Sequence, residues 1–143
     1  MTRALAPGVV RTALLAASLL TASAHAEPPP AQDYVLECRG CHGARGEGVP
    51  GNVPSLAQTA RFLATPRGRA YLVRVPGVAG SQIADARIAA LLNWVLREFA
   101  SDPPAAPNFA PYTASEVASE RARPLLDPHA ERAALLGPSN LNN

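Results

Sequence analysis

The stretch that most constrains this chain is Cys38-Arg39-Gly40-Cys41-His42, which has the pattern C-x-x-C-H. Two thiols three positions apart can each form a thioether with one of the two vinyl groups of a porphyrin, and the next residue can offer an imidazole nitrogen to the iron. Cys38 and Cys41 are the two cysteines of the 143 residues. The motif therefore predicts one covalently attached haem c, held by Cys38 and Cys41, with His42 as an axial iron ligand.

Other chemistries use parts of this region, and the sequence favours none of them. A C-x-x-C pair alone also occurs in thiol–disulfide oxidoreductases and zinc knuckles, but here a histidine follows directly and no βαβ pattern surrounds it. Residues 46–51 match G-x-G-x-x-G formally. No apolar strand precedes them, so they do not indicate a dinucleotide-binding site. We interpret residues 43–54, with four glycines and two prolines, as a loop.

The N-terminus has the parts of a secretory signal in the expected order. A positively charged start and a short run rich in Ala and Leu are followed by Ala24-His25-Ala26, which offers small residues for cleavage. The apolar run is too short to span a membrane. We expect residues 1–26 to be removed near Ala26 on export to the periplasm, which leaves no stable membrane anchor.

The charge balance gives no indication of nucleic-acid binding, and any basic docking surface would have to consist of arginines. The chain has 13 arginines, no lysine and 11 acidic residues, for a formal charge of +2. Removal of Arg3 and Arg11 with the signal leaves 11 arginines against 11 acidic residues, so the exported chain is formally neutral. Neither nucleic-acid binding nor a lysine ring for docking is predicted.

Helical periodicity predicts an all-α fold for the central part of the chain. Residues 32–39 form a short candidate helix after an extended, proline-rich lead-in at 28–30, and residues 55–63 form another. Thr65 and Pro66 have the pattern of an N-cap and first helical residue for a helix through Arg74, which Pro76-Gly77 ends. The strongest helix runs over residues 84–99. In the first of these helices, the spacing places three side chains on one face: Tyr34, Val35 and Cys38. In the last, it forms one apolar stripe: Ile88, Leu91, Leu92, Val95 and Phe99.

The C-terminal part has a different character. Residues 102–111 contain four prolines and are interpreted as a linker. Thr113-x-x-Glu116 predicts a capping box for a helix that Pro124 stops, and Asp127-Pro128 begins a last short helix. We therefore divide the chain into a signal peptide at 1–26, a haem domain at 27–101 and a proline-rich, partly helical extension at 102–143.

Residues 31–100 resemble the class I c-type cytochromes, which are small all-α electron carriers wrapped around one covalent haem. The resemblance lies in a helix leading into C-x-x-C-H, the glycines of the following loop, Pro54-x-Leu56, and a long helix that carries Trp94. It implies that Cys38 and Cys41 hold the haem and that His42 is the proximal iron ligand. It also implies that the Pro54 carbonyl accepts the other ring N–H of His42.

The chain departs from this family at the distal ligand. Class I members usually take a methionine sulfur from the segment before the last core helix, but the one methionine here is Met1, and residues 75–82 contain no strong iron ligand. Three arrangements stay open: an open or water-bound sixth position, ligation by His129, or a weak ligand from Gln82 or Asn93. Replacing methionine by any of these lowers the reduction potential.

These observations predict a periplasmic, monohaem c-type cytochrome that carries single electrons between redox proteins, such as a dehydrogenase and a terminal acceptor, and that is not an enzyme. The alternative is a haem-based gas or peroxide sensor, or a small catalytic haem protein, that uses an open sixth position. The sequence does not reveal a distal histidine–arginine pair for that chemistry. Three arginines on one predicted helix either face the haem propionates or form a solvated surface: Arg67, Arg69 and Arg74.

Overall fold

The computed structural model describes residues 27–106 and 108–137, so the predicted signal segment and Met1 lie outside the described residues. The described chain is helical, as predicted, and its β-type pairing is limited to two isolated bridges, Val49 with Val53 and Ser101 with Pro104. The helices are α1 (Pro30–Glu37), α2 (Arg39–His42), the 3₁₀ helix η1 (Leu56–Ala64), α3 (Pro66–Arg74), α4 (Pro76–Ala79), α5 (Asp85–Glu98), α6 (Ala114–Arg121) and α7 (Pro128–Leu136). None of them is long and apolar enough to cross a membrane.

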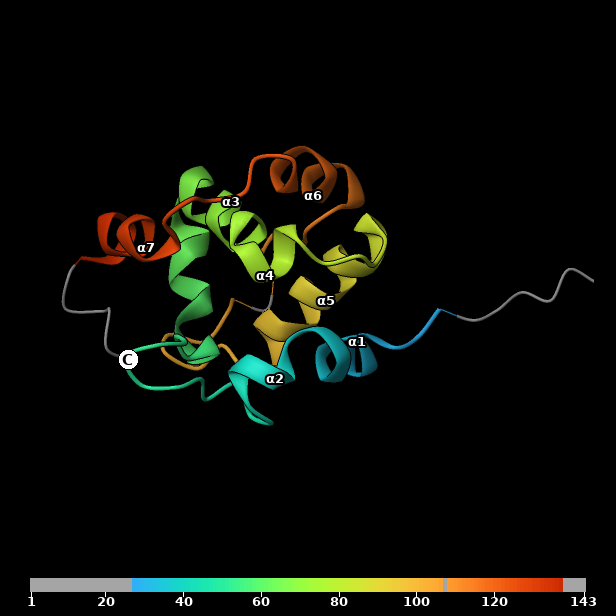
Figure 1. Ribbon diagram of the computed structural model, residues 1–143, viewed down its shortest axis with the longest axis horizontal. Helices are drawn as coiled ribbons and strands as arrows, with labels where there is room; N and C mark the ends of the chain where they lie inside the picture. The colour runs from blue at the N-terminus through green and yellow to red at the C-terminus, as the bar shows by residue number, and fades with distance from the viewer. Residues whose placement is uncertain (1–26, 107, 138–143) are drawn as a thin grey trace, which may run out of the picture.

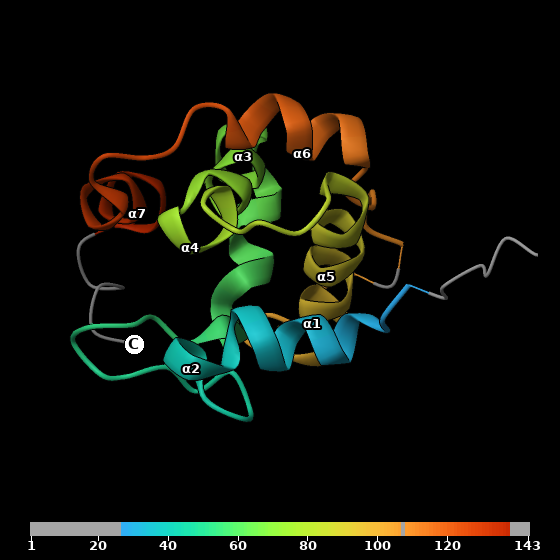
Figure 2. The ribbon, with the colours of Figure 1, turned by 45° about the vertical axis from the view of Figure 1, so that its right-hand side comes forward.

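The helices surround an interior space. In the views of Figures 1 and 2, α1 and α2 lie on one side of the molecule, and α3 and α4 lie on the other. The helices η1 and α5 run between these two sides, and α7 lies beside α3. Helices that are far apart in the sequence therefore face one another across the centre.

Residues at the helix starts explain where α3 begins. The Thr65 hydroxyl accepts a hydrogen bond from the Gly68 N–H at 3.0 Å, and Pro66 occupies the first turn, as predicted. Gly68 also lets η1 and α3 pack closely, because a Cβ at this position would lie 2.3 Å from the Phe62 carbonyl oxygen. Pro76 was predicted only to end the helix through Arg74. It is also the first residue of the short helix α4.

Helix α1 differs from the prediction in two respects. Pro30 is its first residue rather than part of an extended lead-in, because a proline is well tolerated in the first helical turn. Tyr34 is buried, but Val35 is 50% exposed, so the predicted shared face was wrong for Val35. The reason is that α1 also buries Asp33, whose carboxylate pairs with Arg87 on α5.

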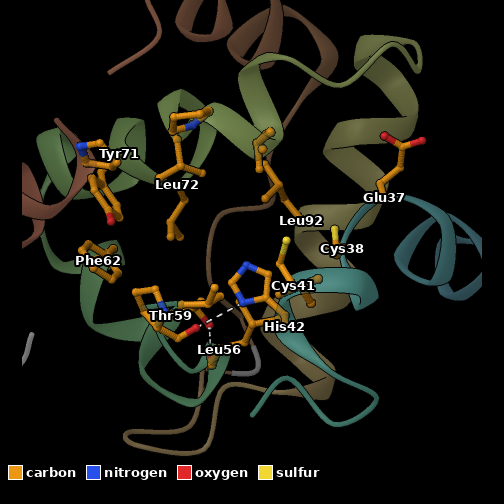
Figure 3. A pocket seen from close by; sticks show the side chains of 18 of the residues that line it. Glu37, Cys38, Cys41, His42, Leu56, Thr59, Phe62, Tyr71, Leu72 and Leu92 are labelled. Carbon is orange, nitrogen blue, oxygen red and sulfur yellow. Dashed lines mark hydrogen bonds between the residues drawn. The ribbon is translucent and has the colours of Figure 1, made fainter. Parts of the chain in front are cut away.

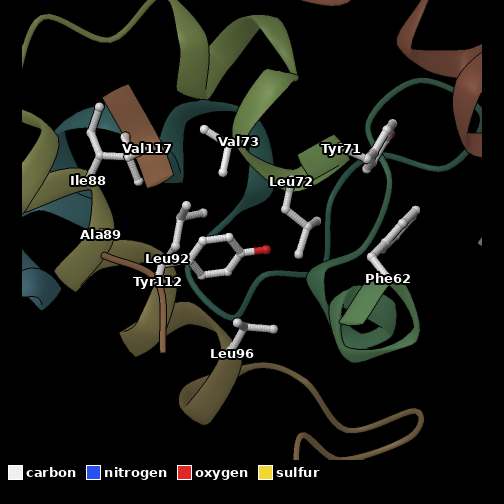
Figure 4. Packing of buried hydrophobic residues seen from close by; sticks show 10 residues of the cluster. All are labelled: Phe62, Tyr71, Leu72, Val73, Ile88, Ala89, Leu92, Leu96, Tyr112 and Val117. Carbon is white, nitrogen blue, oxygen red and sulfur yellow. The ribbon is translucent and has the colours of Figure 1, made fainter. Parts of the chain in front are cut away.

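Helix α5 forms the predicted apolar stripe. Ile88, Leu91, Leu92 and Val95 are buried, Phe99 is partly buried, and Leu96 is buried in addition. One side of α5 packs against α1, where Trp94 lies 5.4 Å from Tyr34 between ring centroids. The other side faces the main core cluster, drawn in Figure 4.

The C-terminal extension belongs to that same core. Tyr112 and Val117 are buried within it, together with residues of η1, α3 and α5 (Figure 4). The Thr113 hydroxyl caps α6 by accepting from the Glu116 N–H at 3.2 Å. The other half of the predicted capping box does not form, because the Glu116 carboxylate binds Arg69 instead, at 2.8 Å from Nη2.

All three arginines of α3 bind residues of the C-terminal extension. Arg67 binds Glu131 on α7 at 2.7 and 2.8 Å. Arg69 binds Glu116 and lies over the Tyr112 ring, with its Cζ 3.9 Å from the centroid. Arg74 donates from Nε to the Arg123 carbonyl oxygen at 2.7 Å. None of these three side chains lines the interior cavity, and that of Arg67 is also exposed to solvent.

Candidate haem site

The C-x-x-C-H motif occupies the junction of α1 and α2. Cys38 follows the last residue of α1 as its C-cap, and α2 forms one turn that ends at His42, whose N–H bonds the Cys38 carbonyl oxygen at 2.9 Å. This turn brings the two thiols and the imidazole to one surface of the helix. Both cysteines are free thiols, Cys38 partly buried and Cys41 exposed.

The orientation of the His42 ring is fixed by a backbone carbonyl. Nδ1 of His42 lies 3.1 Å from the Pro54 carbonyl oxygen, which can only accept, so Nδ1 is the donor. The other nitrogen, Nε2, is then unprotonated and points into a cavity (Figure 3). Burial lowers the pKa of His42, and the bond to Pro54 opposes this in part. A neutral ring with a fixed tautomer is the form that binds iron.

The glycine-rich loop places Pro54 against His42. The His42 carbonyl oxygen accepts from the Gly48 N–H at 2.9 Å, and the Tyr34 hydroxyl donates to the Gly43 carbonyl oxygen at 2.6 Å. Gly48 has a φ of +69°, and a Cβ there would lie 2.3 Å from the Val53 carbonyl oxygen. Glycine is therefore required for the loop to return so closely to its own backbone.

The cavity behind His42 has a volume of about 440 Å³, within the range of cofactor sites. Most of its lining is aliphatic or aromatic, and it reaches from the motif to α3, α4, α5 and α7. Cys38, Cys41 and His42 all line it. An apolar cavity beside two free thiols and an imidazole with an open nitrogen fits a covalently attached haem.

The same geometry disfavours the other uses of C-x-x-C. Burial raises the pKa of Cys38 to about 11, with a further increase from Glu37 and Asp33, whereas reactive thiols have a lowered pKa. Among residues 27–106 and 108–137, no three or more His, Cys, Asp or Glu side chains are grouped to hold a metal ion by themselves. A zinc knuckle is thus not formed by the described residues.

The wall across the cavity from His42 is apolar. Leu72 extends into the cavity from α3, on the far side from His42 (Figure 3), and Val75 and Val78 line it nearby. Neither of the predicted weak ligands, Gln82 and Asn93, lines the cavity. Gln82 donates from Nε2 to the Gly80 carbonyl oxygen at 2.8 Å.

Asn93 instead anchors the extension to α5. Its amide nitrogen donates to the Tyr112 carbonyl oxygen at 3.0 Å, and its amide oxygen accepts from the Tyr112 N–H at 2.8 Å. Both hydrogen-bonding groups of this side chain thus face the backbone of residue 112. No part of the side chain is directed to the cavity.

Helix α7 contributes a histidine and an arginine that sequence reasoning did not bring together. His129 and Arg132 both line the cavity, and Arg132 is only 3% exposed. Their spacing of three positions on a helix places both on one face, which is the signal that could have identified the pair. His129 stays a candidate iron ligand, whereas sequence reasoning missed Arg132.

Comparison with known proteins supports the same assignment. The chain is 35% identical over 135 residues to a cytochrome c-552 of Thermus thermophilus, a match that covers 81% of this chain and 90% of the relative. It is 36% identical over 108 residues to a second cytochrome c-552 of Thermus thermophilus, covering 62% of this chain and 82% of that protein. No family model matches the chain.

Proposed function

This chain belongs to the class I c-type cytochromes, whose prosthetic group is a covalently attached haem c, and on that premise we propose that it is a periplasmic carrier of single electrons between redox proteins. When bound, the haem supplies the ferric–ferrous couple. The N-terminal signal pattern supports the periplasmic location. Its partners are other periplasmic redox proteins, such as a dehydrogenase or a terminal acceptor, met through weak and transient interfaces.

The geometry of the site supports the following roles for its residues. Cys38 and Cys41 hold the haem through thioethers, and His42 is the proximal ligand through Nε2. The Pro54 carbonyl orients the imidazole and increases its basicity. The observation that carries this proposal is the 3.1 Å contact from His42 Nδ1 to Pro54 at the wall of an apolar cavity that both cysteines line.

The described residues include no methionine that could serve as a sixth iron ligand. The cavity wall formed by Leu72, Val75 and Val78 offers only hydrocarbon, which cannot ligate iron. Among the described residues, His129 is then the one histidine besides His42 that lines the cavity. Without a methionine sulfur, we expect a reduction potential below that of a methionine-ligated member of the family.

A redox titration of the purified holoprotein tests this function. We expect a reversible one-electron transition that follows the haem absorbance and lies below the potential of a methionine-ligated cytochrome c measured alongside. His129→Ala separates the two forms of the sixth position, since only ligation by His129 makes the ferric EPR spectrum depend on this substitution. A holoprotein with no reversible one-electron transition would contradict electron carriage.

The second candidate function is binding of a small neutral gas or of peroxide at the sixth position. The aliphatic wall opposite His42 favours it, because such a wall leaves room near the iron without supplying a ligand. Carbon monoxide added to the reduced protein is the test. Rapid and tight binding supports this second function, and refusal to bind excludes it.

A further inference from the structure

The cavity has two chemically different ends. At one end, α1 and α2 contribute Cys38 and Cys41; across the cavity lie Phe62 of η1 and Tyr71 of α3 (Figure 3). The rings of Phe62 and Tyr71 are stacked with centroids 4.5 Å apart. Arg132 of α7 belongs to this second end, since its Cζ is 5.3 Å from the Phe62 ring centroid.

Arg132 is built into this end rather than resting on it. The residue is almost fully buried, and Nη2 donates to the Gln58 Oε1 at 2.8 Å, in a hydrogen bond that is itself buried. The Tyr71 phenol lies near enough that the Arg132 guanidinium lowers its pKa, against the rise caused by burial. A guanidinium buried beside a mostly apolar cavity is costly, and an anionic group bound in that cavity would offset part of the cost.

The haem has such an anion at the required place. Its two propionates lie on the porphyrin edge opposite the two vinyl groups. If thioethers fix the vinyl edge at Cys38 and Cys41, the propionate edge points to the opposite end of the cavity. An arginine suits a carboxylate there, because its planar fork can donate two parallel hydrogen bonds.

We propose that Arg132 of the C-terminal extension binds a haem propionate, with Gln58 and Tyr71 as the residues that position its guanidinium. This inference rests on the proposed haem attachment at Cys38 and Cys41. It gives the extension a direct part in the cofactor site, because α7 forms the wall that closes the cavity at its propionate edge. Residues 128–136 are then as much a part of the site as the C-x-x-C-H motif.

The outside of α7 offers a matched control. Glu131 is adjacent to Arg132 in sequence and binds Arg67 of α3 at 2.7 and 2.8 Å. Arg67 does not line the cavity, and its side chain is 62% exposed. Arg67→Gln therefore removes one ion pair between α3 and α7 and one positive charge. It leaves the charge inside the cavity unchanged.

The test is the midpoint potential of the holoprotein measured as a function of pH, from about pH 5 to pH 9. An arginine beside a propionate keeps that carboxylate ionised over this range, so the wild-type potential stays flat where the propionate would otherwise titrate. In Arg132→Gln the pKa of the propionate is higher, so reduction takes up a proton within this range. The pH interval over which the potential depends on pH, which is the sloping segment of the profile, then shifts upward by about 1–3 pH units. Tyr71→Phe keeps the ring stack and shifts this segment less, in the same direction.

Four other titratable groups lie near this end of the cavity. They are Tyr71 on α3, Arg61 on η1, and His129 and Glu131 on α7. The imidazole among them is that of His129, which therefore has a variant of its own. His129→Gln combined with Arg132→Gln therefore retains the shifted segment if a propionate is its source, and loses it if the imidazole is.

Several outcomes overturn the proposal. The first is an Arg132→Gln profile that superimposes on the wild type while haem remains covalently attached, and it leaves the proposed function intact. The second is an equal shift in Arg67→Gln, which assigns the effect to the docking of α7. Absence of covalent haem from the wild-type protein overturns the proposed function as well. If Arg132→Gln does not fold, a Tyr71→Phe profile of potential against pH that equals the wild-type profile contradicts the proposal by itself.

Discussion

The two ends of the cavity are built in opposite ways. The motif end takes its two thiols and its imidazole from Cys38–His42, a run of five consecutive residues, and one loop returns Pro54 to them. The other end joins Gln58, Tyr71 and Arg132, which come from η1, α3 and α7. The geometry of the motif end is set within one short segment of chain, whereas the second end forms only after three distant segments have packed together.

Two buried tyrosines, Tyr34 of α1 and Tyr112 of the C-terminal extension, show that both of these parts of the chain are packed into the fold. Tyr34 of α1 is 2% exposed and donates its hydroxyl to the Gly43 carbonyl oxygen. Tyr112 of the extension is 4% exposed and donates its hydroxyl to the Arg69 carbonyl oxygen at 2.8 Å. Each ties its own segment to a different element, so the extension is a structural part of the haem-binding unit.

The largest expected effect compares these tyrosines directly. Tyr112→Ala and Tyr34→Ala should each lower the free energy of unfolding by about 3–5 kcal/mol, because each removes a buried ring and a hydrogen bond. Denaturant unfolding of the holoprotein measures both. Leu126→Ala, at a fully exposed position, serves as the control. If Tyr112→Ala behaves like Leu126→Ala, the extension is not part of the core.

A pair of valines sharpens the comparison at the next level. Val117 in α6 is fully buried, so Val117→Ala should cost about 2 kcal/mol. Val35 in α1 is 50% exposed, and Val35→Ala should change stability by less than about 0.5 kcal/mol. Thermal or denaturant unfolding distinguishes the two. The reverse order would mean that the helical pattern of residues 32–39 was interpreted correctly and that the orientation of α1 described here is wrong.

The smallest effect concerns alkaline pH. Burial raises the pKa of Tyr112 well above its ordinary value near 10, so the folded state keeps the phenol protonated after the unfolded chain has begun to ionise. The stability from this group is complete below about pH 10 and is lost as the pH rises further. Tyr112→Phe should cost about 1 kcal/mol at pH 7 through the lost hydrogen bond.

The same variant should therefore lose stability less steeply than the wild type above about pH 10. Tyr34→Phe is the matched measurement, since burial also raises the pKa of Tyr34. Unfolding free energies measured from about pH 7 to about pH 11 decide the point. Parallel curves for Tyr112→Phe and the wild type would show that this phenol does not contribute to the alkaline loss.

Much of the fold could be predicted because its signals are local. The N-cap Thr65, the proline at residue 66 and the apolar stripe of α5 each act within one or two helical turns, and the helices form where they predict. The orientation of α1 could not be predicted in this way. Its buried face is decided by the pairing of Asp33 with Arg87, which lies 54 residues away.

The same distinction applies to the site. The contact of His42 with Pro54 spans a short loop and was implied by the family resemblance, and the structure contains it. The partners of Arg67 and Arg69 are carboxylates of the extension, and nothing in the local sequence indicates such distant pairing. Arg132 was missed for this reason too, because its place beside Gln58 depends on how α7 docks.

The central claim is that one haem is joined through sulfur to Cys38 and Cys41. Intact mass spectrometry of the exported, denatured protein tests it most directly, together with the double variant Cys38→Ala/Cys41→Ala. The account predicts a wild-type mass equal to the polypeptide cleaved near Ala26 plus one haem, and a double variant without that increment. A wild-type protein with the mass of the bare polypeptide would contradict it.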